Sequence, residues 1–205
     1  MIKQTFMGVL PDVWPMLIII SVIISSLRIA YLITKHKKFL LHKEIIYLLA
    51  IIYILCLFHV VTFQDINYGE SNFVPFKEIF RYSFGSHKFI RNVLGNIILF
   101  IPFGFLSSYL LKNRHLSVVT ILTLIASGTI ETVQYYIGRV FDIDDIILNL
   151  IGGIVGFLIF IGLDAIRNKV KLLKNDTVLD ILIIIILVLV MVYSLNINVF
   201  NLIGG

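Results

Sequence analysis

Long runs of apolar residues, separated by short polar segments, dominate the chain. Six runs are long enough to cross the roughly 30 Å hydrocarbon core of a bilayer as α-helices, because a span needs about 20 apolar residues. We place these spans at residues 13–34, 44–63, 93–111, 116–137, 146–163 and 179–200. The runs lack strict alternation, which disfavours a membrane β-barrel. The pattern therefore predicts an all-α, polytopic transmembrane helix bundle of about six spans.

Composition agrees with a membrane environment. Hydrophobic residues make up 59% of the chain and charged residues only 14%, whereas about 25% of a soluble domain is charged. The net charge of +5 comes from 17 basic and 12 acidic residues. Basic residues between apolar spans mainly set orientation and meet anionic lipid headgroups. We therefore expect membrane lipids as partners and no nucleic acid.

The basic residues are distributed unequally between the two sides. The linkers after the first, third and fifth spans carry ten: Lys35, Lys37, Lys38, Lys43, Lys112, Arg114, Arg167, Lys169, Lys171 and Lys174. The opposite side carries six: Lys3, Lys77, Arg81, Lys88, Arg91 and Arg139. The positive-inside rule then predicts that both chain termini are extracytoplasmic. The loop 64–92 and the turn 138–145 are expected on that same outer side.

A polar stripe begins at the turn before the fifth span. If a helix starts near Asp142, residues three and four apart share a face, and Asp142, Asp145 and Asn149 align with Gly152 and Gly156. The glycines favour close helix contact. Asp144 breaks this spacing, since it lies roughly 100° from Asp145 around a helix of 3.6 residues per turn. We expect Asp144 to face water or lipid headgroups instead.

Two further spans carry polar groups. Glu131 and Gln134 are three residues apart in the fourth span, and a carboxylate in a span costs roughly 2.5–3.5 kcal/mol or more unless it faces the protein interior or water. Either Arg139 forms a structural ion pair with Glu131 or with Asp142, or Glu131 belongs to a site. Asn92 and Asn96 lie one turn apart at the start of the third span.

The outer loop predicts a short amphipathic helix near Phe76–Arg81. Its apolar face would carry Phe76, Ile79 and Phe80, so the helix can lie at the membrane interface or fold back as a lid. The basic residues of this loop offer another reading, in which they hold a lipid phosphate. They are Lys77, Arg81, Lys88 and Arg91.

Taken together, these segments resemble the VanZ family of membrane proteins. The resemblance spans about residues 44–195 and rests on Asn72-Phe-Val-Pro75-Phe76, Asn92 through Asn96-Ile-Ile-Leu-Phe-Ile-Pro102-Phe-Gly104, Glu131-x-x-Gln134, and Arg139-x-x-Asp142-x-x-Asp145-x-x-x-Asn149-x-x-Gly152-Gly153. It implies a VanZ-like domain at 44–205, preceded at 1–43 by an additional span and a cytoplasmic basic linker. It also implies a bacterial plasma-membrane protein, and the family's namesake lowers susceptibility to the glycopeptide teicoplanin.

Two functions from different classes follow. The leading hypothesis is a VanZ-like envelope protein that binds an amphiphile at the outer leaflet, either a lipid-linked wall precursor or a lipoglycopeptide, with no metal and no cofactor. Its candidate ligand-binding residues are Asn72, Asn92, Asn96, Glu131, Gln134, Arg139, Asp142, Asp145 and Asn149. The rival is an intramembrane enzyme that uses Glu131, Asp142 and Asp145 as acid and base, or to hold a divalent metal. A transporter is less favoured, because inverted repeats are not evident.

Overall fold

The computed structural model describes residues 2–63 and 71–187, which are almost entirely helical. In chain order the α-helices are α1 (Ile2–Thr34), α2 (Leu41–Phe63), α3 (Lys77–Arg81), α4 (His87–Phe89), α5 (Gly95–Leu111), α6 (Leu116–Tyr136) and α7 (Ile143–Lys169). A π-helical turn, Ile90–Leu94, joins α4 to α5, and a 3₁₀ turn, Lys171–Lys174, follows α7. Residues 176–187 are helical again.

Five helical segments of the described chain are long and apolar enough to cross a membrane. They are Trp14–Thr34, Leu41–Val60, His87–Leu111, Leu116–Tyr136 and Ile143–Lys169. The predicted all-α, polytopic bundle is therefore confirmed, and the protein is a multi-pass membrane protein. The predicted sixth span, 179–200, lies mostly outside the described residues. The third span begins earlier than its apolar run suggested, because the helix already includes the polar residues Lys88 and Asn92.

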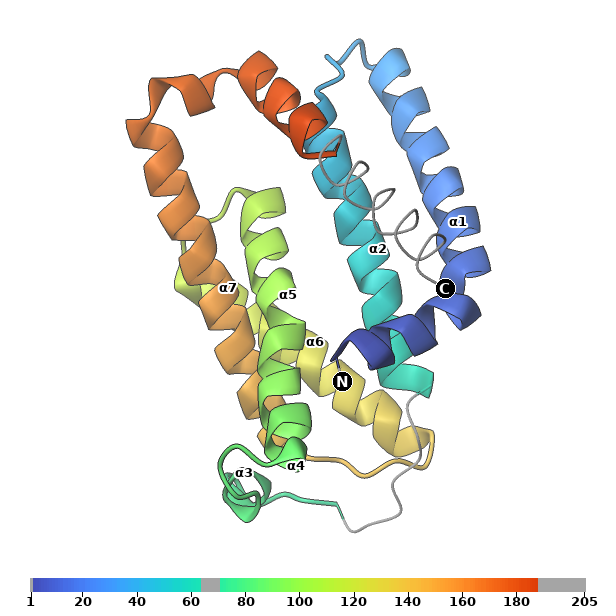
Figure 1. The fold of residues 1–205 in the computed structure, drawn as a ribbon, viewed down its shortest axis with the longest axis vertical. Helices are drawn as coiled ribbons and strands as arrows, with labels where there is room; N and C mark the ends of the chain where they lie inside the picture. The colour runs from blue at the N-terminus through green and yellow to red at the C-terminus, as the bar shows by residue number, and fades with distance from the viewer. Residues whose placement is uncertain (1, 64–70, 188–205) are drawn as a thin grey trace, which may run out of the picture.

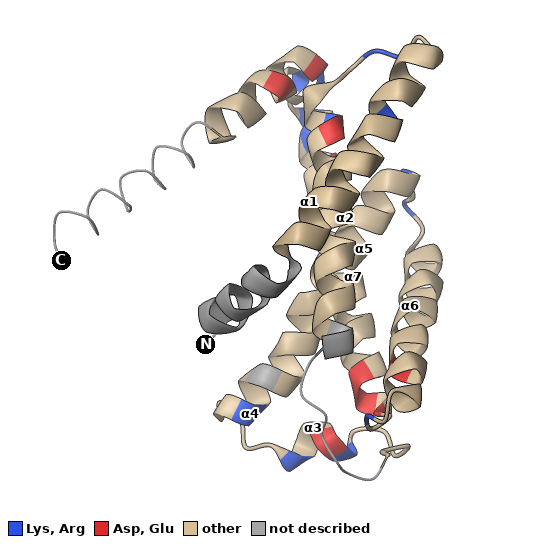
Figure 2. Ribbon diagram, turned by 90° about the vertical axis from the view of Figure 1, so that its right-hand side faces the viewer, with Lys and Arg blue, Asp and Glu red and all other residues tan. Residues whose placement is uncertain are grey.

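The helices form two adjoining groups (Figure 1). Helix α7 packs along both α5 and α6, while α1 packs against α2. The short helices α3 and α4 lie at one end of the α5–α7 group, beside the turn that leads into α7. The Lys, Arg, Asp and Glu residues gather towards the two ends of the molecule, and the helices between them carry few charged residues (Figure 2). This distribution fits a bilayer core around the middle.

Glycines let α5 and α7 touch backbone to backbone. A Cβ atom at Gly104 would overlap the backbone of Gly153, and one at Gly156 would overlap the backbone of Ile101 and lie 2.7 Å from the nitrogen of Phe105. In lipid, such close approach is a main source of helix association, because hydrocarbon solvent gives little drive to bury apolar side chains. The packing role predicted for the glycine stripe is confirmed.

The end of the bundle away from α3 and α4 is held by ion pairs. Arg28 of α1 donates to both carboxylate oxygens of Glu44 on α2, at 2.9 and 3.1 Å, and its guanidinium lies 4.4 Å from the ring centroid of Tyr47. His42 of α2 contacts Asp180 through Nδ1 at 2.7 Å and through its backbone N–H at 2.8 Å. These contacts tie α1 and the helix 176–187 to α2.

Candidate functional site

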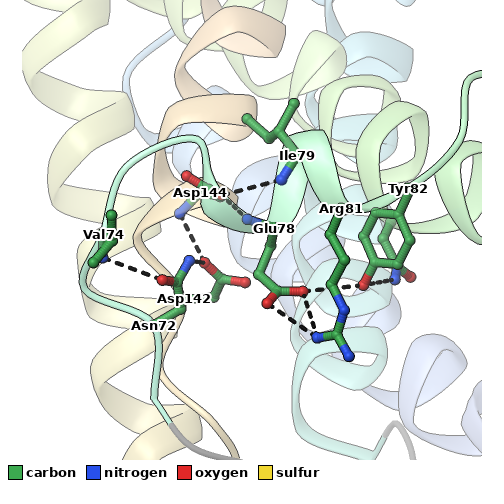
Figure 3. A network of polar contacts seen from close by, with 9 residues as sticks. Asn72, Val74, Glu78, Ile79, Arg81, Tyr82, Asp142 and Asp144 are labelled. Carbon is green, nitrogen blue, oxygen red and sulfur yellow. Dashed lines mark hydrogen bonds and ion pairs between the residues drawn. The ribbon is translucent and has the colours of Figure 1, made fainter.

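The outer loop is joined to the start of α7 through Asn72. Its backbone N–H donates to the carbonyl of Phe141 at 2.8 Å, and its carbonyl accepts from Ile143 N–H at 3.0 Å, as a short parallel β-bridge. The Asn72 side chain donates to Asp142 Oδ1 at 2.9 Å, and its oxygen accepts from Val74 N–H at 3.1 Å (Figure 3). Asn72 is buried. Its backbone N–H, its carbonyl and its side-chain NH₂ fix the loop against the start of α7, while its Oδ1 shapes the loop itself.

Asp144 corrects the sequence prediction. Instead of facing water or lipid headgroups, it is only 1% exposed. Its Oδ1 accepts from Phe76 N–H at 2.5 Å, and its Oδ2 accepts from Glu78 N–H at 2.7 Å and from Ile79 N–H at 3.2 Å (Figure 3). The helical spacing correctly predicted that Asp144 points away from Asp145. The loop, however, folds over this face of α7 and turns its backbone N–H groups towards the carboxylate.

These three contacts of Asp144, which we call the Asp144 clamp, hold a strained piece of backbone. Phe76 has φ 68°, in the left-handed region that residues other than glycine rarely adopt. It immediately precedes α3, whose first donors Glu78 and Ile79 are two of the N–H groups that Asp144 binds. A carboxylate is stabilised at the positive end of a helix, where it accepts from N–H groups that have no partner within the helix. Asp144 therefore stabilises both the left-handed conformation of Phe76 and the short helix α3.

Glu131 is buried at 2% exposure and bonds to the same turn. Its Oε2 accepts from Asp142 N–H at 3.0 Å. With the Gln134 amide oriented to satisfy its neighbours, its nitrogen donates to Glu131 Oε1 at 3.0 Å and its oxygen accepts from Arg139 Nη1 at 2.9 Å. The structure therefore links Glu131 to Arg139 indirectly, through the Gln134 amide.

Asp142 connects these groups to the helix. It is the N-cap of α7, and its Oδ1 accepts from Asp144 N–H at 2.9 Å as well as from Asn72. Burial raises the pKa of the Asp142 carboxyl above its usual range, while the hydrogen bonds from Asn72 and Asp144 oppose that rise. The N-cap bond satisfies one of the unpaired N–H groups at the helix start.

Asp145 and Asn96 form a second part of the site. The Asn96 amide of α5 donates to Asp145 Oδ1 at 2.5 Å. The other Asp145 oxygen has no hydrogen bond to any residue of the described chain. Asp145 is also within electrostatic range of Glu131, Asp142 and Arg139. Asp145 therefore lies near Glu131 and Asp142, and it retains an oxygen able to accept a further bond.

The remaining predicted residues lie deeper or further out. Asn149 is buried and donates to Ser127 of α6 at 2.8 Å, leaving its own Oδ1 without a partner in the described part of the molecule. Asn92 donates to the hydroxyl of Tyr82, at 2.9 Å. The arrangement therefore places Asn92 with the outer loop and Asn149 within the span, away from the Asp142 contacts.

Two buried polar residues of α6 were not predicted from the sequence. Ser127 and Thr123 are fully buried, and they lie one turn and two turns before Glu131. Their positions at four-residue intervals place all three on one helix face, so the spacing contained the signal. Together with Asn149, they extend the polar face of α6 and α7 from the membrane end towards its middle.

The donor set for metal binding is limited. Among residues 2–63 and 71–187, no group of three or more His, Cys, Asp or Glu side chains is arranged to hold a metal ion.

The fold and these contacts define a multi-pass helical membrane protein, in which a polar network at one end of the bundle joins the loop that contains Asn72 to α5, α6 and α7. The chain belongs to the VanZ family, because a family model described as VanZ/LLP1 matches residues 44–167, more than half of it. The predicted resemblance is thereby confirmed, and the match ends near the end of α7. No curated protein and no solved structure matches the chain.

Proposed function

We propose that this protein is a bacterial plasma-membrane protein that binds an amphiphile at the outer leaflet and thereby lowers susceptibility to teicoplanin-type lipoglycopeptides. The ligand is a lipid-linked cell-wall precursor or the lipoglycopeptide itself. Membership of the VanZ family supports this class. The excess of basic residues in the opposite linkers supports an extracytoplasmic position for the polar network.

One observation carries the choice of contact residues. Both carboxylate oxygens of Glu131 and of Asp144 accept hydrogen bonds. Asp142 Oδ1 accepts from Asn72 and from Asp144 N–H as the N-cap of α7, so these three carboxylates already serve the fold. Asp145 accepts from Asn96 and has a second oxygen without a partner among the described residues. A carboxylate oxygen of this kind accepts from the hydroxyl or amide groups of a sugar or peptide headgroup. In this proposal Asp145 and Asn96 contact the ligand.

The positioning role falls to the rest of the network. Asn72 and Asp142 hold the outer loop on α7, and Glu131 fixes the turn before α7 through Asp142 N–H. Arg139, held through Gln134, brings a cation to the same turn. These contacts hold Asp145 near the membrane interface, at the level of the lipid headgroups.

Asp145→Asn tests the proposal, with Asp164→Asn as its matched control. Both residues lie on α7, but Asp164 pairs with Arg114 near the other end of the helix. Expression of the wild type in a susceptible host is expected to raise the teicoplanin concentration that inhibits growth. We expect Asp145→Asn to remove most of this effect, since losing a charge-assisted bond weakens binding by roughly tenfold or more.

Membrane levels of each variant must be measured alongside, so that loss of protein is not mistaken for loss of binding. Asp164→Asn should retain the protection at equal protein level. Equal losses in both variants, or a loss that follows protein level, would contradict the assignment of Asp145 to ligand binding.

The second candidate is an intramembrane enzyme acting on a lipid-linked substrate. The observation that favours it is the proximity of Asp145 to Glu131, carried on two different helices, since paired carboxyl groups in unlike environments can divide acid and base roles. Its test is turnover by the purified protein. A new product formed from a lipid-linked wall precursor by the wild type, and lost in Asp145→Asn, would favour the enzyme over the binder.

A further inference from the structure

A basic pocket lies in the outer loop, next to the polar network. It has a volume of about 400 Å³ and is lined by Arg81, Tyr82, Ser83, Ser86, His87 and Lys88. Small-molecule sites have volumes of about 300–1,000 Å³, so this one suits a small polar group. None of the lining residues is acidic, and the hydroxyl and cationic groups match the acceptor oxygens of a phosphate.

The wall of the pocket is fixed by a chain of contacts. Asn92 donates to the hydroxyl of Tyr82 at 2.9 Å, and that hydroxyl lies 3.5 Å from Glu78 Oε2. Glu78 in turn accepts from Arg81 Nη1 at 3.1 Å (Figure 3). This series of contacts connects helix α3 to the π-helical turn Ile90–Leu94, and such turns are frequent at functional sites. The pocket wall is therefore braced before any ligand arrives.

The charge available to a ligand comes mainly from Lys88. Because Arg81 is paired with Glu78, its charge is partly compensated. Lys88 and His87 make no side-chain hydrogen bond or ion pair with the rest of the described chain, and Lys88 is exposed. A lysine ammonium is an effective point charge for phosphate.

The surroundings indicate that the phosphate belongs to an amphiphile. Phe80 and Phe84, which flank the lining residues Arg81–Ser83, are 82% and 92% exposed. Aromatic rings at this level favour the membrane–water interface, so an acyl or prenyl chain can lie along them while its headgroup enters the pocket. Phe84 also packs against Phe89, with ring centroids 5.1 Å apart, which sets it beside the pocket.

We infer that this pocket binds the phosphate of an amphiphile headgroup through Lys88, Arg81 and the serine hydroxyls. The inference rests on the proposed function in taking the ligand to be an amphiphile, and it adds the chemical class of its headgroup. In this arrangement the pocket holds the phosphate of the amphiphile. Asp145 contacts donor groups of the same amphiphile or of a second ligand molecule.

The test uses the purified full-length protein in neutral detergent micelles, with bound lipid counted by native mass spectrometry. The probe is dioleoyl phosphatidic acid, and dioleoylglycerol is the matched lipid without phosphate. We expect the wild type to bind the first and not the second. Lys88→Gln should weaken phosphatidic acid binding on the order of tenfold. Lys77→Gln removes the same charge from an exposed position outside the pocket and should change it less than about twofold.

Each outcome bears on the inference. Equal weakening by the two lysine variants, or equal binding of dioleoylglycerol, would overturn the pocket. Displacement of the lipid by an equal concentration of inorganic phosphate would keep the site but identify free phosphate as its ligand. Because binding is measured directly, failure here contradicts only the pocket. Failure of the teicoplanin test with Asp145→Asn contradicts the proposed function.

Discussion

Asp144→Asn should release the outer loop from the bundle. The carboxylate of Asp144 is 1% exposed and accepts three backbone N–H groups, at 2.5, 2.7 and 3.2 Å. Asparagine keeps one acceptor oxygen and turns an NH₂ group towards the remaining donors, so at least one N–H loses its partner. A hydrogen bond to a charged group contributes about 1.5–3 kcal/mol. We expect the loop to lose about 3 kcal/mol of local stability.

Limited trypsin digestion in detergent measures this opening, because Lys77 and Arg81 lie within the clamped segment. When the loop recloses faster than it is cut, the cleavage rate follows the population of the open form. A loss of about 3 kcal/mol then predicts cleavage roughly 100-fold faster. Asp164→Asn, near the opposite end of α7, should leave that rate within about threefold.

If Asp144→Asn and Asp164→Asn are cleaved in the loop at the same rate, the three N–H contacts do not hold the loop closed. If Asp144→Asn instead unfolds the whole bundle, the carboxylate stabilises the protein globally, and the loop is not a separate unit.

Two more predictions test the packing and the orientation. Gly156→Ala places a Cβ against the backbone of Ile101 and Phe105, so the free energy of unfolding in detergent should fall by about 1–3 kcal/mol or more. Gly162→Ala, on the same helix with open space around it, should leave that free energy unchanged or slightly raised. The orientation is tested with single cysteines in place of Lys37, Ser86 or Lys171, labelled in whole cells with an impermeant thiol reagent. Labelling at Ser86 alone is expected, and labelling at Lys37 but not Ser86 would reverse the assigned sides.

The features that sequence could predict depend on one helix at a time. The spans follow from hydropathy and length, and the shared face of Asp142 and Asp145 follows from 3.6 residues per turn. The close contact at Gly156 was predictable as well, since small residues four apart mark a helix interface in lipid. The short helix α3 followed from amphipathic spacing, although its exact neighbours did not.

The features that sequence could not supply depend on how distant segments meet. Asp144 and Ile79 are 65 positions apart, and no local pattern indicates that the loop folds back to bring its N–H groups to that carboxylate. The prediction for Asp144 was therefore wrong in its surroundings but correct in its angle relative to Asp145. By contrast, Thr123 and Ser127 could have been found, because they repeat the four-residue spacing that ends at Glu131.

The contacts also decide which carboxylate can report on function. Loss of Asp142 would remove the N-cap of α7, the bond from Asn72 and part of the loop's attachment, so a phenotype would follow whether or not Asp142 meets a ligand. Asp145 has one side-chain bond, from Asn96, and its second oxygen serves no described contact. Its replacement by asparagine preserves shape and an acceptor while removing the charge. A functional loss at stable protein level is therefore interpretable for Asp145 and ambiguous for Asp142, which is why the susceptibility test is built on Asp145.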